Sequence, residues 1–124
     1  MRARQTRGHA AYALGVDAEA NVCATLEQDG WTILGRRLRT AAGEVDVVAE
    51  KDGLLAVIEV KARPKLADAA FSLTLRQRVR LISAAEILLA ENPGWGRAGV
   101  RFDLLLVDRA GTVRRIADAF RLEG

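Results

Sequence analysis

Three charged residues, Asp46, Glu59 and Lys61, interrupt the apolar runs of residues 43–61, GEVDVVAEKDGLLAVIEVK. Charged groups among apolar neighbours are costly to bury unless they pair with one another or bind an ion. Two carboxylates together could hold Mg²⁺, which prefers hard oxygen ligands, and a main-chain carbonyl such as that of Val60 could be a third ligand. Lys61 could then position or deprotonate an attacking water, or neutralise charge that develops on a phosphate. These residue types suit hydrolysis of a phosphodiester.

The same residues also have a purely structural interpretation. A Glu59–Lys61 or Asp46–Lys61 ion pair on a solvated face of a sheet would need no ligand. An Asp followed at a distance by Glu-x-Lys is a weak pattern by itself; here Glu59 follows Asp46 by 13 positions (59 − 46 = 13). It carries more weight because both parts lie in apolar strands that a short turn joins.

A β-hairpin is the element that must position these residues. Asp52-Gly53 is a dipeptide typical of the tight turn that closes a hairpin. Because strand side chains alternate between faces, Glu59 and Lys61 share one face of the second strand. In the first strand, the alternation predicts that Glu44, Asp46 and Val48 share one face and that the other face carries Val45, Val47 and Ala49.

A helix is predicted before the hairpin, from about Ala10 to Asp29. Its apolar stripe repeats every four residues, and Gly30 is placed to end it; the stripe consists of Leu14, Ala18, Val22 and Leu26. Glu19 lies at the edge of this stripe. It is either an exposed carboxylate on the helix flank or an acidic group that reaches the cluster around Asp46.

The other elements complete an α/β pattern. Residues 31–39 are predicted to form a strand, and Thr74 with Gln77 forms a capping box that begins a helix ending near Glu91. Residues 100–107 and 112–117 are predicted to form two more strands, the last at an edge. The order of helix, three strands, helix and two strands predicts one α/β sandwich with a mixed sheet. The second helix is expected to carry one apolar stripe with a second beside it: Leu75, Val79, Ile82 and Leu89, then Leu81, Ala85 and Leu88.

Composition restricts the chemistry that is available. The 124 residues suit one domain, with residues 10–124 as its body and residues 1–9 as a basic tail that is either solvated or an arm for phosphates. His9 and Cys23 are the only residues of their types, which excludes Ser-His-Asp and Cys-His catalysis and histidine or cysteine metal clusters. No apolar run is long enough to cross a membrane and no signal peptide is recognised. We therefore expect a soluble, cytoplasmic protein without a membrane partner.

The basic character of the chain is compatible with a nucleic-acid partner. The formal net charge is +3 and the calculated pI is about 9.6. Several arginines and lysines around the hairpin and on the second helix could contact phosphates in a sequence-independent, salt-sensitive manner. For each of them a solvated position on the surface of an arginine-rich protein is the alternative. The candidates are Arg36, Arg39, Arg63, Lys65, Arg76 and Arg80.

Four short motifs occur in the chain, in this order: Gly15-Val16-Asp17-Ala18-Glu19, Gly43-Glu44-Val45-Asp46, Glu59-Val60-Lys61-Ala62-Arg63 and Arg101-Phe102-Asp103. Together they resemble the YraN-like family of bacterial proteins, and the resemblance covers about residues 10–120. The ending Ala117-Asp118-Ala119-Phe120 is also similar to that of the family. The family in turn resembles the restriction-endonuclease-like PD-(D/E)xK superfamily, and especially archaeal Holliday-junction resolvases.

The resemblance implies a fold and a set of roles. The fold would be the restriction-endonuclease-like αβββαβ core, in agreement with the predicted order of elements. Asp46 and Glu59 would be ligands of Mg²⁺ or Mn²⁺, Lys61 the catalytic lysine, and Glu19 the additional acidic residue of the resolvase branch. The substrate would be DNA, branched or damaged. The resemblance also implies a homodimer, because junction-cutting relatives act as dimers, although the sequence carries no interface signature.

Two positions depart from the family pattern. Gln77 stands where the family usually has a lysine, which weakens the basic lining expected there, and Arg37 stands near a usual asparagine, so no role is carried over to it. Two alternatives to a nuclease remain open. One is a nucleic-acid-binding or protein-interaction module without catalysis on the same fold, and the other is a structural protein whose charges pair with each other.

Overall fold

The computed structural model of the protein describes residues 17–63 and 73–120, the last four of these by their backbone alone. The elements are α2 (Ala18–Gln28), β1 (Thr32–Thr40), β2 (Gly43–Lys51), β3 (Leu54–Ala62), α3 (Leu75–Glu91), β4 (Gly99–Val107) and β5 (Val113–Phe120). This is the predicted order, and it contains the αβββαβ core followed by one more strand. The tail at residues 1–9 lies outside the described residues.

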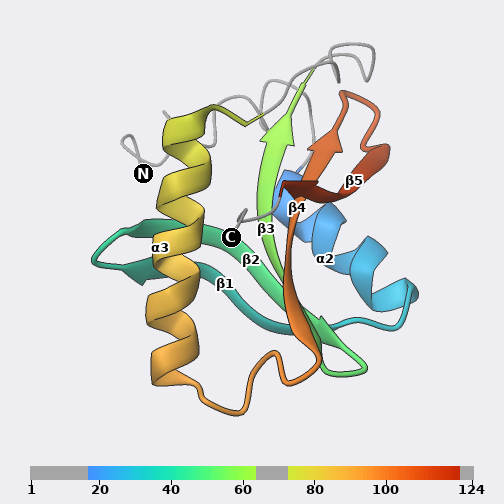
Figure 1. The fold of residues 1–124 in the computed structure, drawn as a ribbon. Helices are drawn as coiled ribbons and strands as arrows, with labels where there is room; N and C mark the ends of the chain where they lie inside the picture. Colours follow the sequence, from blue (N-terminus) through green and yellow to red (C-terminus); the bar gives the residue numbers. More distant parts are fainter. Residues whose placement is uncertain (1–16, 64–72, 121–124) are drawn as a thin grey trace.

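The strands form one mixed sheet in the order β1-β2-β3-β4-β5. Neighbouring strands are antiparallel except β3 and β4, which run parallel because α3 carries the chain back between them. α3 covers one face of the sheet and α2 the other (Figure 1). The predicted α/β sandwich with a mixed sheet is confirmed, and β5 is an edge strand as expected. No helix among the described residues is long and apolar enough to span a membrane.

The α2 helix shows how local sequence determines the ends of an element. Asp17 has extended dihedral angles, and its Oδ1 accepts the amide of Ala20 at 3.1 Å, so it caps the helix at its start. Gly30 has φ +92°, and Trp31 donates to the carbonyl of Leu26 at 2.9 Å, which closes the C-terminus as a Schellman motif. The predicted start of this helix at about Ala10 is therefore wrong, because Asp17 is extended and α2 begins at Ala18; residues 10–16 lie outside the described residues.

The turn between β2 and β3 is as tight as predicted. Asp52 and Gly53 both have positive φ, +52° and +81°, as the two central residues of a hairpin turn of the favoured twist require. The β2–β3 ladder runs from the pair Lys51↔Leu54 to the pair Val47↔Ile58. This turn fixes the register of the two strands that carry the candidate site.

Two apolar clusters fill the layers on either side of the sheet. The cluster under α3 lies between this helix and the sheet and includes Val45, Val48, Leu55, Val57, Leu81, Leu88 and Leu104. The cluster under α2 lies on the other face and includes Val22, Leu26, Val47, Ala49, Ile58 and Leu105. The expectation that Val45 shares a face with Val47 and Ala49 is wrong, because Val45 packs in the cluster under α3 with Val48. The alternation breaks at Asp46, just beyond the last ladder pair of β2 and β3.

The buried face of α3 corresponds to the second of the two expected stripes and not to the first. It consists of Leu81, Ala84, Ala85 and Leu88. At about 100° of rotation per residue, Leu75 and Val79 lie more than a quarter turn away from this face. They are accordingly 72% and 54% exposed. The capping box is present as predicted: the backbone N–H of Gln77 donates to the Thr74 hydroxyl, and the backbone N–H of Thr74 donates to the side-chain oxygen of Gln77.

Candidate functional site

Asp46 lies where the ladder between β2 and β3 ends. Its carboxylate is almost inaccessible, with the residue 4% exposed, and its Oδ2 accepts the amide of Val60 at 2.9 Å. The side chain thus bridges to β3 just past the last ladder pair. In a strand, the N–H and C=O of one residue face the same neighbour. The carbonyl of Val60 is therefore on the Asp46 side of β3, as a third metal ligand would have to be.

Glu59 and Lys61 share the α3 face of β3, as their spacing predicted. Glu59 is 5% exposed, and the Lys61 Nζ lies 3.1 Å from its Oε2. The other oxygen, Oε1, accepts a hydrogen bond from Nη2 of Arg80 on α3, also at 3.1 Å. Both oxygens of the Glu59 carboxylate are therefore bound by cations. The formal charges of Asp46 and Glu59 are balanced by those of Lys61 and Arg80.

Arg80 reaches Glu59 because Gly43 makes room for it. A Cβ at position 43 would lie 2.7 Å from Cδ and 2.8 Å from Cγ of Arg80, and Gly43 has φ +134°, which other residues rarely adopt. Among the described residues, Nε of Arg80 is the buried side-chain nitrogen or oxygen that has no hydrogen-bond partner. Arg80 was predicted to be a phosphate contact, and its bond to Glu59 was not predicted.

Glu19 is held by two arginines from β1. Nε of Arg37 lies 2.7 Å and Nη2 of Arg36 3.8 Å from its Oε1. The interpretation of Glu19 as an exposed carboxylate is wrong, because the residue is 4% exposed. Arg37, to which no role was assigned, is its closest cationic partner among the described residues and has the unusual φ of +50°. Its positive φ sets it apart from the neighbouring arginines of β1, and a sequence does not display this property.

The other predicted phosphate contacts are spread around the site. Arg39 is largely exposed, 3.8 Å from Glu44, and Arg76 is exposed on α3. Arg63 donates from Nη1 to the carbonyl of Ala62 at 2.8 Å, directly after β3. Lys65 lies outside the described residues. The described members therefore lie on β1, on α3 one turn before Arg80, and directly after β3.

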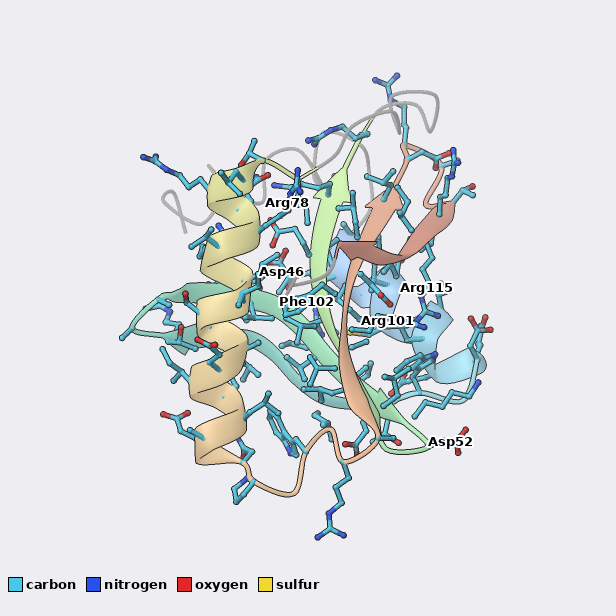
Figure 2. The ribbon with its side chains drawn as sticks, viewed as in Figure 1. Asp46, Asp52, Arg78, Arg101, Phe102 and Arg115 are labelled. Atoms are coloured by element: carbon cyan, nitrogen blue, oxygen red, sulfur yellow. The ribbon has the colours of Figure 1, made fainter. Side chains whose placement is uncertain are left out.

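A second charged cluster lies on the α2 face of the sheet and was not predicted. The Asp103 side chain is fully inaccessible, and it accepts hydrogen bonds from Nε and Nη2 of Arg101 at 2.9 and 3.0 Å and from Nε and Nη2 of Arg115 at 3.2 and 2.9 Å. Both guanidinium groups also lie over the ring of Trp31, 5.5 and 4.8 Å from its centroid. Figure 2 shows Arg101 and Arg115 together near α2, apart from Asp46. This cluster is satisfied internally and joins β4 to β5.

The residues around Asp46 fit a divalent cation by the chemistry of their donors. Two carboxylates and one carbonyl are hard oxygen donors, and Mg²⁺ typically keeps several waters beside one or two carboxylates. In the part of the chain that the structure describes, no three His, Cys, Asp or Glu side chains gather as a ligand set, so Glu19 does not join Asp46 and Glu59 in one. A site built on these residues would use two carboxylates.

Comparison with known proteins places the chain among its relatives. The model of the uncharacterised protein family UPF0102 matches residues 18–107. The chain belongs to this family. It is 59% identical to a UPF0102 protein of Granulibacter bethesdensis over 117 residues, which is 94% of this chain and 74% of the relative. A UPF0102 protein of Azorhizobium caulinodans is 50% identical over 118 residues, 95% of this chain and 90% of the relative.

The family assignment confirms the resemblance to the YraN-like family, while the resemblance to the PD-(D/E)xK superfamily stays a prediction. The region matched by the UPF0102 model includes Glu19, Asp46, Glu59 and Lys61. A further UPF0102 protein, from Rhodopseudomonas palustris, is 41% identical over 111 residues, 90% of this chain and 85% of the relative. None of these names states an activity, so function has to be argued from the site.

Proposed function

We propose that this UPF0102 protein is a nuclease that depends on a divalent metal and hydrolyses phosphodiester bonds of DNA. The observation that carries the proposal is a pair of nearly inaccessible carboxylates on adjacent strands, Asp46 and Glu59, with the Lys61 amine 3.1 Å from one of them. Burying charged groups is costly, and apolar residues of similar volume would often make a more stable sheet. A catalytic role in phosphodiester hydrolysis is a reason for the protein to retain these buried charged residues.

Each residue has a role that follows from its position. Asp46, Glu59 and the carbonyl of Val60 would hold Mg²⁺ or Mn²⁺. When bound, such an ion polarises the phosphate and favours formation of the hydroxide nucleophile. The Lys61 ammonium carries three donors and is partly exposed, so it can orient the attacking water or donate to a phosphate oxygen as charge develops. Arg63 and Arg76 contribute phosphate contacts at the edges of the site.

The proposal extends to the substrate and the assembly by resemblance alone. The resemblance to junction resolvases implies branched or damaged DNA as the substrate, cleaved by a homodimer. A fold hosts many activities, so these extensions have to be tested separately from the chemistry. Glu19 is included as an accessory acidic residue, which in this structure is neutralised by Arg36 and Arg37.

One observation favours a second candidate, a module that binds nucleic acid or a protein without catalysis. Both oxygens of Glu59 are already bound by cations, as they would be in an ion-pair network that serves only the fold. This candidate predicts DNA binding that weakens steeply as salt is raised, with no strand cleavage by any divalent ion.

The Asp46→Asn variant separates the two candidates. An asparagine oxygen can still accept the Val60 amide, so the variant should fold, while it loses one of the two charged ligands. The nuclease predicts that wild type binds Mn²⁺ and nicks DNA, and that Asp46→Asn does neither. Asp52→Asn, in the exposed turn, is the matched control and should behave as wild type. Equal Mn²⁺ binding by Asp46→Asn and wild type would refute the site.

A further inference from the structure

We propose that Arg80 competes with the divalent ion for Glu59. Its guanidinium binds the Glu59 carboxylate in the metal-free protein and transfers to a phosphate of the nucleic acid when the ion binds. The inference rests on the proposed function, because it concerns the same carboxylate. It adds a role for Arg80 that couples metal binding to substrate binding.

Glu59 cannot keep all of its cationic partners and also serve as a metal ligand. Lys61 occupies Oε2 and Arg80 occupies Oε1, each at 3.1 Å. A divalent ion at either oxygen would meet a positive charge within about 4 Å, where like charges repel strongly in partly buried sites. One of the two cations therefore has to give way, and Lys61, two residues along the same strand and face, has less freedom to leave.

Arg80 holds Glu59 through an incomplete contact. Only its Nη2 bonds the carboxylate, while its Nε is buried without an acceptor among the described residues. Within the same protein, Arg101 shows what a complete contact looks like, with Nε and Nη2 paired to the two oxygens of Asp103. A buried donor without a partner destabilises its position, so the guanidinium of Arg80 gains a hydrogen bond by moving.

The surroundings of Arg80 permit this motion. The aliphatic stem packs on the backbone of Gly43, where a side chain would clash with Cγ and Cδ, so the stem is fixed close to the sheet. The side chain as a whole is 35% exposed. Rotation about the outer bonds can thus carry the guanidinium from Glu59 towards solvent, where a phosphate of bound nucleic acid would be its new partner.

Mn²⁺ affinity, measured by the electron paramagnetic resonance signal of the free ion, tests the competition directly. Arg80→Gln removes the competing charge and should bind Mn²⁺ about tenfold more tightly than wild type, the effect expected from one charge-assisted hydrogen bond. Arg97→Gln, exposed beyond the C-terminal end of α3, makes the same change of net charge and should match wild type. Equal or weaker binding by Arg80→Gln would overturn the inference while leaving the nuclease proposal standing. Absence of Mn²⁺ binding in wild type and Arg80→Gln alike would overturn both.

A second measurement uses the wild-type protein and needs no folded variant. In a protein with ¹⁵N-labelled arginine side chains, addition of Mg²⁺ should shift the Nε–H resonance of Arg80 and accelerate its exchange with water. The corresponding resonance of Arg101, bound to Asp103 on the other face, should not change. An Arg80 resonance that is unaffected at Mg²⁺ concentrations that saturate the site would refute the transfer.

The substrate half of the inference is tested with Ca²⁺ and a labelled DNA duplex at constant ionic strength. Wild type should bind the duplex more tightly when Ca²⁺ is present, because Arg80 is then available to a phosphate. The gain should be retained by Arg97→Gln and reduced in Arg80→Gln. The same gain in all three proteins would show that Arg80 does not make the new contact.

Discussion

Asp103 is expected to hold the fold together, in contrast to the carboxylates of the proposed site. Its side chain is fully inaccessible and receives four guanidinium N–H groups at 2.9 to 3.2 Å. Replacement with asparagine keeps the shape and removes the charge. With the amide oxygen at the Oδ2 position, three of these contacts persist as weaker bonds, while the amide nitrogen faces Nε of Arg101, donor against donor.

The magnitude follows from this geometry. Removing one member of a buried ion network typically costs about 3–5 kcal/mol. Arg101 and Arg115 are each about a quarter exposed, so water can compensate part of the loss, and the Trp31 ring still faces both cations. We therefore expect a loss at the lower end, about 3 kcal/mol, which lowers the melting temperature of a domain of this size by about 12 °C.

Urea unfolding followed by tryptophan fluorescence is the assay, because Trp31 lies in the cluster itself. Asp52→Asn is the matched control: it makes the same change of charge at an exposed residue whose positive φ asparagine tolerates, and it should unfold as wild type does. Asp46→Asn should cost about 1 kcal/mol at most, since it keeps the bond to Val60. A loss below about 1 kcal/mol in Asp103→Asn would refute the structural role of this cluster.

Three further predictions concern other parts of the molecule. Gly43→Ala should lower the free energy of unfolding by about 1–3 kcal/mol, measured in urea, because it combines a strained φ with a clash against Arg80; an unchanged midpoint would contradict this. Burial raises the pKa of the Cys23 thiol above its ordinary value of 9.0. As the pH rises, the thiol therefore loses its proton in the unfolded chain before it does so in the folded protein, so the free energy of unfolding should fall above about pH 9. Cys23→Ala should flatten that fall, and the same pH profile of stability in the variant and in wild type would refute the prediction. Glu19→Gln should remove one negative charge beside Arg37 and increase the salt-sensitive affinity for DNA, which fluorescence anisotropy can measure; weaker binding would count against a phosphate-facing position for this arginine.

Much of the architecture could be predicted because it depends on local signals. The turn at Asp52-Gly53, the capping box at Thr74 and the glycine that ends α2 are each encoded within a few residues, and they determine the order of elements. The face shared by Glu59 and Lys61 followed from strand periodicity alone. The buried stripe of α3 was predicted less well, because the sequence offers more apolar positions than the sheet covers.

The parts that could not be predicted depend on contacts between distant residues. Arg80 meets Glu59 across 21 positions, and Arg115 meets Asp103 across 12, through helix and strand packing that no local pattern specifies. The alternation of faces breaks at Asp46, where a side chain instead of the main chain of β2 accepts the hydrogen bond from β3. This bond depends on the neighbouring strand, so the sequence of β2 alone does not predict it. Arg101 and Asp103 were visible in one motif, but neither their bond nor the second partner, Arg115, could be predicted from it.

Cleavage of labelled DNA is the measurement that tests the central claim most directly. Duplex, single strand, flap and four-way junction would be incubated with Mg²⁺ or Mn²⁺ and with wild type, Lys61→Ala or Lys51→Ala, the last being an exposed lysine at the far end of β2. We expect products that depend on the metal and are made by wild type and Lys51→Ala, while Lys61→Ala makes none. Metal-dependent products that persist in Lys61→Ala, or DNA that binds to wild type and stays intact with both metals, would contradict the central claim.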